Sequence, residues 1–334
     1  MKRFFLLIAL FLVPYITAKP CTTFVLKTKD GIFFGRNLDW VSDMGFAIIN
    51  KRNMSKESLV FGDEKSISWV SKYGSISFNQ FGKEFPFGGM NEKGLVVEIM
   101  VSVAEYPEPD NRAMINELQW VQYQLDNCQT VDEVIATDNK IRIGQAHESL
   151  HYLVSDANGN VAAIEFTEGK MVVYKGKDLP MPVLENDLYS ESLENYKENR
   201  LGRFSTAVDG VKKYKESSGK PVEYCFDLLK KVALSGEWSM VYDINKKEIH
   251  FRTNSNENIR QVNFTSFDFG CNDEVLGYDL ASQDAGNVSS KFIKLSSTAN
   301  NKLVKDAMAK GKIVLETDQS SKLMGYFNHT KCAN

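Results

Sequence analysis

The sequence predicts an α+β fold, because strand patterns occur in antiparallel groups and helical patterns cluster between those groups. Residues 149–155 and 161–166 have strand character, and Asn158-Gly159 between them is typical of a tight hairpin turn. Residues 116–127 carry apolar side chains at helical spacing. Strands and helices do not alternate one by one, as they would in a parallel βαβ sheet.

The remaining elements are predicted from the same periodicities and turn signals. Residues 21–26 and 32–36 form a hairpin that turns at 29–31. Thr130 and Glu133 make a capping box, which predicts the start of a second helix. Further strands are expected at 69–78, 94–103, 171–174, 239–242 and 248–252, and further helices at 191–215 and 222–234.

The first 20 residues have the layout of a segment that is removed during export. Lys2 and Arg3 precede an apolar run at 4–13, and Ala18 offers a small residue for cleavage. A membrane-spanning helix needs about 20 apolar residues, so this run is too short to be one. We expect three parts: a signal peptide at 1–18, a short propeptide at 19–20, and a single domain at 21–334. The mature protein is then secreted or periplasmic, or lies in the lumen of a eukaryotic secretory pathway.

The composition argues against several classes of partner. Hydrophobic residues make up 43% of the chain and include 21 Phe, enough to bury a substantial core. The formal net charge is −3 and positive charge is scattered, which argues against nucleic acid and anionic membrane surfaces. No segment after the signal peptide is long and apolar enough for an integral membrane helix. The expected partner is a small molecule, and homo-oligomerisation is left open.

The five cysteines are an odd number, which in an exported protein predicts a free thiol or an intermolecular bond. Cys128 and Cys225 lie in apolar helical patterns and are expected to be buried thiols. The disulfide pairing among these two, Cys271 and Cys332 is left open. Four Asn-X-Ser/Thr sequons, about as many as chance predicts, leave glycosylation open: Asn53, Asn263, Asn287 and Asn328.

Cys21 is the first candidate for chemistry. Cleavage after Ala18 and removal of Lys19-Pro20 would make it the first residue, with its α-amine beside its own thiol. An α-amine has an ordinary pKa of about 7.7–8.0 and can act as a general base near neutral pH. A thiol, with a pKa of about 8.5, needs only modest activation to attack an amide carbonyl.

The predicted hairpin brings two charged residues toward Cys21. A turn centred on residues 29–30 pairs Cys21 with Leu38, so Arg36 and Asp39 lie within two positions of that pair. Arg36 is expected to lower the pKa of the thiol, and Asp39 to accept a hydrogen bond from the α-ammonium. Residues 36 and 39 cannot share one face of a regular strand, so the strand must bend or end near 37–38.

These segments resemble the choloylglycine hydrolase family, which includes bile salt hydrolases and penicillin V acylases. The resemblance covers most of the mature chain in the same order. It implies a four-layer αββα N-terminal-nucleophile hydrolase fold, with two antiparallel sheets between layers of helices. The segments that carry it are Cys21-Thr-Thr, Gly35-Arg-Asn-Leu-Asp-Trp40, Gly89-Met-Asn-Glu-Lys-Gly-Leu95, Ser149 to Asp156, Gly202-Arg-Phe204 and Trp238-Ser-Met-Val-Tyr-Asp243.

The resemblance also implies roles for individual residues. Cys21 matches the nucleophile, Arg36 the arginine beside the thiol, and Asp39 the aspartate that binds the α-amine. The oxyanion hole of the family matches the side chain of Asn186 and the backbone N–H of Val101. The alternative for Asn186 is to cap a helix at 188–196, and the alternative for Val101 is a place in the core.

The chain departs from the family at two places. Many relatives carry Asn or Tyr where this chain has Val101, which a backbone donor tolerates. The late active-site arginine of bile salt hydrolases has no match, and Glu237 lies near the expected position. Specificity for bile salts is therefore not carried over by the resemblance.

The implied reaction is hydrolysis of a non-peptide linear amide through a thioester acyl-enzyme, with no cofactor and no metal. The substrate candidates are conjugated bile salts, penicillin V, N-acyl homoserine lactones and fatty acid amides. The Phe-rich composition favours an acyl group that is largely hydrophobic.

Two rival hypotheses follow from other features. His147, Glu148 and His151 match the H-E-x-x-H zinc signature, which requires a helix and a third ligand. Gly144 before the motif and an Asn-Gly turn after it favour a strand here instead. The second rival is a non-catalytic secreted binding protein that is lipid-anchored or disulfide-bonded, but Pro20 is unsuited to precede a lipidated cysteine.

Overall fold

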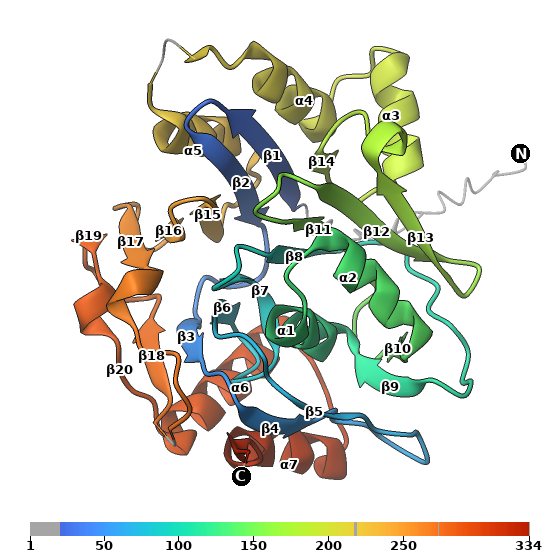
Figure 1. Cartoon of the computed structure of the whole chain (residues 1–334), viewed down its shortest axis with the longest axis vertical. Coiled ribbons are helices and arrows are strands. Elements are labelled where there is room, and N and C mark those ends of the chain that lie inside the picture. The colour runs from blue at the N-terminus through green and yellow to red at the C-terminus, as the bar shows by residue number, and fades with distance from the viewer. Residues whose placement is uncertain (1–20, 217–218, 273, 334) are drawn as a thin grey trace, which may run out of the picture.

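Two large β-sheets pack face to face at the centre of the molecule (Figure 1). The computed structural model describes residues 21–216, 219–272 and 274–333, so the expected signal peptide and propeptide lie outside it. One sheet has seven strands in the order β14 (Val183–Leu184), β1 (Thr22–Thr28), β2 (Gly31–Leu38), β15 (Trp238–Asp243), β16 (Glu248–Thr253), β17 (Arg260–Asn263) and β19 (Gly286–Asn287).

The second sheet has nine strands. Their order is β13 (Lys170–Lys175), β12 (Val161–Thr167), β11 (Leu150–Ser155), β8 (Val96–Val101), β7 (Pro86–Asn91), β6 (Ser75–Asn79), β3 (Phe46–Asn50), β18 (Leu276–Asp279) and β20 (Ile293–Lys294). Pairing in both sheets is antiparallel except between β17 and β19.

Helices cover the outer faces of the two sheets. Helices α4 (Arg203–Lys213) and α5 (Pro221–Val232) pack on β1 and β2, and α1 (Glu117–Asn127) packs on β7 and β8 from the opposite side (Figure 1). The layers therefore run helix, sheet, sheet, helix, which confirms the predicted αββα arrangement. Because both faces of each sheet are covered, consecutive residues of β1 such as Phe24 and Val25 are both buried.

The hairpin of β1 and β2 has the predicted register. Thr22 lies opposite Asn37 and Thr28 opposite Gly31, so the turn falls at residues 29–30. Strand β2 ends at Leu38, as the different faces of Arg36 and Asp39 require. Gly35 is needed for a close approach, because a Cβ there would lie 2.4 Å from the ring of Phe24 on the opposite strand.

Other predicted elements are confirmed with small changes at their ends. Asn116 caps α1 with its side chain, and Thr130 caps α2 (Val131–Ala136) by accepting from the N–H of Glu133. The hairpin of β11 and β12 and the late hairpin of β15 and β16 form as predicted.

Two predicted elements are wrong in extent. The strand expected at 69–78 is two strands in different sheets, β5 (Ser68–Val70) and β6, because the chain turns between them and Lys72 and Tyr73 donate to the carbonyl of Asp126. The helix expected at 191–215 is broken into α3 (Tyr189–Lys197) and α4. Asn199 adopts a left-handed conformation with φ 59°, which ends α3.

The C-terminal part of the chain lies against the nine-stranded sheet and the β4–β5 region (Figure 1). Helices α6 (Ser297–Gly311) and α7 (Thr317–Gly325) precede a short strand, β21 (Lys331–Cys332), which pairs with β4 (Met54–Glu57).

A disulfide joins Cys271 to Cys332, whereas Cys128 and Cys225 are buried free thiols, as predicted for these two. Strands β9 (Ala113–Asn116) and β10 (Ile141–Gly144) form a small parallel pair. Within the described ranges, no helix has the length and apolarity to cross a membrane.

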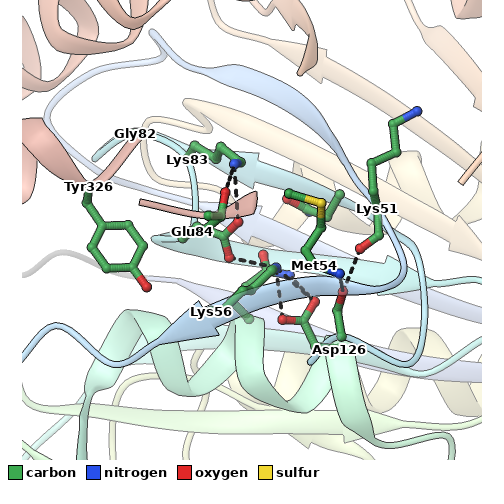
Figure 2. Close-up of polar contacts among 12 residues, drawn as sticks. Lys51, Met54, Lys56, Gly82, Lys83, Glu84, Asp126 and Tyr326 are labelled. Atoms are coloured by element: carbon green, nitrogen blue, oxygen red, sulfur yellow. Dashed lines mark hydrogen bonds and ion pairs between the residues drawn. The ribbon is translucent and has the colours of Figure 1, made fainter. Parts of the chain in front are cut away.

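A buried ionic cluster joins β4, the 82–85 turn and α1 (Figure 2). Nζ of Lys56 lies 2.7 Å from Oε2 of Glu84 and 2.9 Å from Oδ2 of Asp126, and all three residues are buried. Burial lowers the pKa of Lys56, but the two carboxylates outweigh burial and leave it raised. Burial raises the pKa of Asp126 to about 6, against the opposing effect of Lys56. Each charge therefore depends on its partners remaining in place.

We predict that Lys56→Met destabilises the fold by about 3–5 kcal/mol, because it leaves two buried carboxylates without a cation. The loss is expected to be larger at pH 8 than at pH 5, since the unpaired carboxyls can take up protons as the pH falls. Urea unfolding at both pH values measures this. The control is Lys213→Met, which removes an exposed ion pair with Asp209 and should change stability by less than about 0.5 kcal/mol. If Lys56→Met lowers the free energy of unfolding by as little as the control does, the cluster does not stabilise the fold.

Candidate active site

Cys21 lies directly before β1 and is almost fully buried, with 2% of its surface exposed. Its backbone N–H donates to Oδ1 of Asn186 over 2.6 Å, across 165 residues of sequence. Its backbone carbonyl accepts from Nη1 of Arg203 on α4, which also donates to Oγ1 of Thr22 at 3.0 Å. The backbone of the cysteine is therefore held on both sides by side chains.

Arg36 on β2 forms an ion pair across the two sheets. Its Nε lies 2.6 Å from Oε2 of Glu98 on β8, and its Nη2 donates to the carbonyl of Ile99 at 3.1 Å. The hydroxyl of Tyr242 donates to the other oxygen of Glu98. Gly88 leaves the space for this carboxylate, since a Cβ at residue 88 would lie 2.1 Å from it.

Asp39 uses one carboxylate oxygen to hold a neighbouring loop. Its Oδ1 accepts from the backbone N–H groups of Leu234 at 3.0 Å and Ser235 at 2.6 Å, and also from that of Gly236. Its Oδ2 is buried and has no hydrogen-bond partner among the described residues. Here the Cys21 nitrogen is a peptide N–H that donates to Asn186, and the predicted hydrogen bond from a free α-ammonium to Asp39 stays a prediction. The backbone N–H of Asp39 donates to the Cys21 sulfur.

Asn186 lies in the segment between β14 and α3. Its Nδ2 donates to the carbonyl of Val101 at 2.7 Å, and its Oδ1 also accepts from Nη2 of Arg203 at 3.2 Å. Helix α3 has Leu188 as its N-cap, so the alternative in which Asn186 caps this helix is wrong. The structure brings Asn186, Val101 and Cys21 together, but the contact it shows at Val101 is with the carbonyl.

Two residues that contact this group were not predicted as site residues. Arg203 belongs to the Gly202-Arg-Phe204 motif, which drew attention only as part of the family resemblance. Glu98 has a signal of its own, because it is the single charged residue in Val-Val-Glu-Ile-Met-Val, a strand that is otherwise apolar. A charge in a buried strand requires a buried partner, and Arg36 provides it.

Burial dominates the ionisation of the two groups in this site. It raises the pKa of the Cys21 thiol, although Arg36 acts to lower that pKa, as predicted, and the Asp39 N–H and Arg203 act in the same direction. Burial likewise raises the pKa of Glu98 to about 7, against Arg36 and the Tyr242 hydroxyl. Folding therefore favours the protonated form of Glu98. The stability that this form contributes is fully present below the ordinary pKa of a glutamate and is lost as the pH rises through about 7.

Cys21 and Arg36 line a pocket of about 890 Å³, a volume that includes its open mouth. Most of the lining is apolar, and it includes a group of aromatic residues: Trp40, Phe61, Phe81, Phe85 and Phe87. Asn116 and Glu117 also line it, but Asn116 caps α1 and Glu117 accepts from backbone N–H groups of residues 146–148. The pocket therefore offers an apolar space that leads to a thiol.

The zinc motif does not have the geometry that a metal site requires. His151 lies in β11, with Nδ1 3.2 Å from Oε1 of Glu165, whereas His147 precedes the strand and is 43% exposed. A strand cannot place residues 147 and 151 on one helical face. Within the described parts of the chain, no group of three or more His, Cys, Asp or Glu residues could hold a metal ion.

We predict that Glu98→Gln lowers the pH at which the Cys21 thiol ionises. Ionised Glu98 offsets the charge of Arg36, so its removal leaves the guanidinium free to stabilise the thiolate, by about one pH unit. The rate of iodoacetamide alkylation as a function of pH, measured on the Cys21 peptide by mass spectrometry, gives the midpoint. The exposed Glu168→Gln variant should match the parent. A midpoint that stays in place or rises in Glu98→Gln would show that Glu98 does not control the field of Arg36.

Comparison with known proteins agrees with this arrangement. The family model for linear amide C–N hydrolases of the choloylglycine hydrolase family matches residues 21–208. The chain is similar to a penicillin V acylase of Pectobacterium atrosepticum, with 31% identity over 178 residues, 47% of each chain. It is also similar to a bile salt hydrolase/transferase of Clostridium perfringens, with 27% identity over 172 residues, 46% of this chain and 50% of the relative. These matches span about half the length of each relative.

Solved structures share the fold. The penicillin V acylase from Agrobacterium tumefaciens superposes with a TM-score of 0.73 and 23% identity, covering 83% of this chain and 98% of its own. A conjugated bile acid hydrolase from Clostridium perfringens superposes with a TM-score of 0.62 and 18% identity, covering 77% and 96%. With more than half of its residues matched by the family model and the same layered architecture, the chain belongs to the choloylglycine hydrolase family of linear amide C–N hydrolases.

Proposed function

We propose that this protein hydrolyses a linear, non-peptide amide with a largely apolar acyl group, and that Cys21 is the nucleophile. The observation that carries this proposal is the position of Cys21, whose thiol opens onto an apolar pocket while side chains hold its backbone on both sides. Such a held nucleophile beside an apolar space suits attack on an acyl group that the space binds.

The reaction requires a free α-amine at residue 21, which removal of residues 1–20 would supply. The amine takes the thiol proton, and the thiolate adds to the amide carbonyl carbon. The carbon–nitrogen bond then breaks, the leaving amine takes the proton, and a thioester remains on Cys21. Water, deprotonated by the same α-amine, attacks the thioester, which releases the carboxylic acid and returns the proton to sulfur.

Several contacts support these roles. Asn186 accepts from the Cys21 nitrogen at 2.6 Å and can orient the α-amine in the processed protein. The buried Oδ2 of Asp39 is available as a second acceptor for that amine. An amide nitrogen carries two hydrogens, so Asn186 Nδ2 can donate to an oxyanion together with the Val101 N–H, as the family resemblance implies. Arg203 joins this set as a positioning residue, since it holds Cys21 through its carbonyl.

The pocket and the disulfide support the remaining parts of the proposal. An apolar lining favours an apolar acyl group over the polar amine as its occupant. The bond between Cys271 and Cys332 is of a kind that persists in oxidising compartments, which supports export to the periplasm or the exterior. We infer a small-molecule amide substrate and no cofactor.

We expect the active protein to begin at Cys21 and Cys21→Ser to lose turnover by orders of magnitude. Serine keeps the α-amine and the size of the side chain but lacks the nucleophilicity of sulfur. Intact mass, melting temperature and amide hydrolysis are measured together on the two proteins. An active species that begins at Lys19 would contradict the α-amine as base, and an unchanged rate with lower stability would make Cys21 structural.

Asn186→Ala should lower kcat by about 10²–10³, the usual effect of removing one oxyanion donor. The melting temperature is measured in parallel, since the side chain also fixes the Cys21 nitrogen. The control is Asp187→Ala at the adjacent exposed position, which should leave kcat within about twofold of the parent. Turnover of Asn186→Ala within about threefold of the parent would remove Asn186 from the mechanism.

A further inference from the structure

Beyond the residues that the family model matches, the chain contributes a wall to the pocket that contains Cys21. We propose that residues 297–325, here called the C-terminal cap, form the wall that sets the length of the apolar acyl group that the pocket accepts. The cap consists of α6, the connection 312–316 and α7. This inference rests on the proposed function, which places the acyl group in the pocket.

All three parts of the cap reach the pocket. The same space that Cys21 lines is also lined by four residues of the cap: Met308 on α6, Ile313 and Leu315 on the connection, and Leu323 on α7. Between the two lining residues of the connection, Val314 points outward and is 93% exposed. The connection therefore turns alternate side chains toward the pocket, and the side chains that face it are aliphatic.

The aromatic lining of the pocket is joined to the cap by several contacts. The N–H of Lys83 donates to Oδ1 of Asn300 on α6 at 2.8 Å. The hydroxyl of Tyr326, just after α7, donates to the carbonyl of Glu57, and its ring lies 5.3 Å from that of Phe85. Because Phe85 lines the pocket, this ring contact links the aromatic lining to the end of the cap.

The buried ionic cluster lies behind this junction. Figure 2 shows the side chain of Glu84 between those of Lys83 and Lys56, with Tyr326 to the left. Glu84 has a left-handed backbone with φ 74°, a conformation that is strained in a residue with a side chain and persists only where surrounding contacts impose it. Lys56 and Lys83 both face its carboxylate, at 2.7 and 3.7 Å. These contacts hold the segment between Phe81 and Phe87 in place from the side away from the pocket.

A pocket with aliphatic and aromatic walls recognises an alkyl chain by burial alone. Each methylene that enters it contributes about 0.8 kcal/mol, which corresponds to about fourfold in kcat/KM. The gain stops where the chain meets the far wall. The length at which kcat/KM stops rising therefore reports the position of that wall, and a change in the cap should move it.

The test uses amides of 7-amino-4-methylcoumarin with straight-chain acids from acetyl to hexadecanoyl, so that the leaving amine stays constant. For Leu315→Trp we expect the ratio of kcat/KM on the longest substrates to kcat/KM on the shortest to fall at least about tenfold relative to the parent. Leu315→Ala should shift the plateau toward longer chains, and this second variant keeps the test valid should the larger side chain impair folding. Val314→Trp, the adjacent exposed position, should keep the parent profile.

Equal profiles for the parent, Leu315→Trp and Leu315→Ala would overturn the inference while leaving the proposed function intact. A parent that hydrolyses none of the amides would contradict the proposed function instead. Binding separates the two cases, because the dissociation constants of straight-chain carboxylates for Cys21→Ser, with and without Leu315→Trp, can be measured by isothermal titration calorimetry. The cap inference requires the affinity of long carboxylates to fall in Leu315→Trp, and an unchanged affinity would reject it.

Discussion

The ion pair between Arg36 and Glu98 fixes how the two sheets meet beside Cys21. Both side chains are 1% exposed, and taking such charges from water costs several kcal/mol for each ion unless other contacts replace hydration. The carbonyl of Ile99 and the hydroxyl of Tyr242 supply those contacts, and Gly88 provides the space. A sliding of one sheet over the other would separate the pair, so the position of β2 relative to β8 is fixed.

Burial beside this ion pair keeps the thiol of Cys21 uncharged. Burial outweighs the positive field of Arg36, so the thiol has a raised pKa and keeps its proton. In the proposed mechanism such a thiol needs a base at the moment of attack, which suits an α-amine that belongs to the same residue. Asn186 and Arg203 hold the backbone of Cys21, so the proposed proton transfer would occur within a geometry that is already set.

Much of the fold could be predicted because it depends on local patterns. The register of the first hairpin follows from turn residues at 29–31, and the start of α1 follows from Asn116 as a cap. The strand expected at 69–78 was misjudged because a long-range contact interrupts a continuous local pattern. At 71–74 the chain leaves one sheet for another because its N–H groups bond to Asp126, and no residue near 71–74 encodes that partner.

The sequence by itself determined the layered α+β class, the family, and the grouping of Cys21, Arg36 and Asp39 at one end of a hairpin, since hydrophobic period, turn chemistry and short motifs are local properties. The tertiary structure decided which groups meet: that the Cys21 nitrogen bonds to Asn186, that Arg36 pairs with Glu98, and that the cap lines the pocket. Burial also decided the direction of the pKa shifts. Desolvation and pairing depend on what surrounds a group in space, which sequence spacing does not specify.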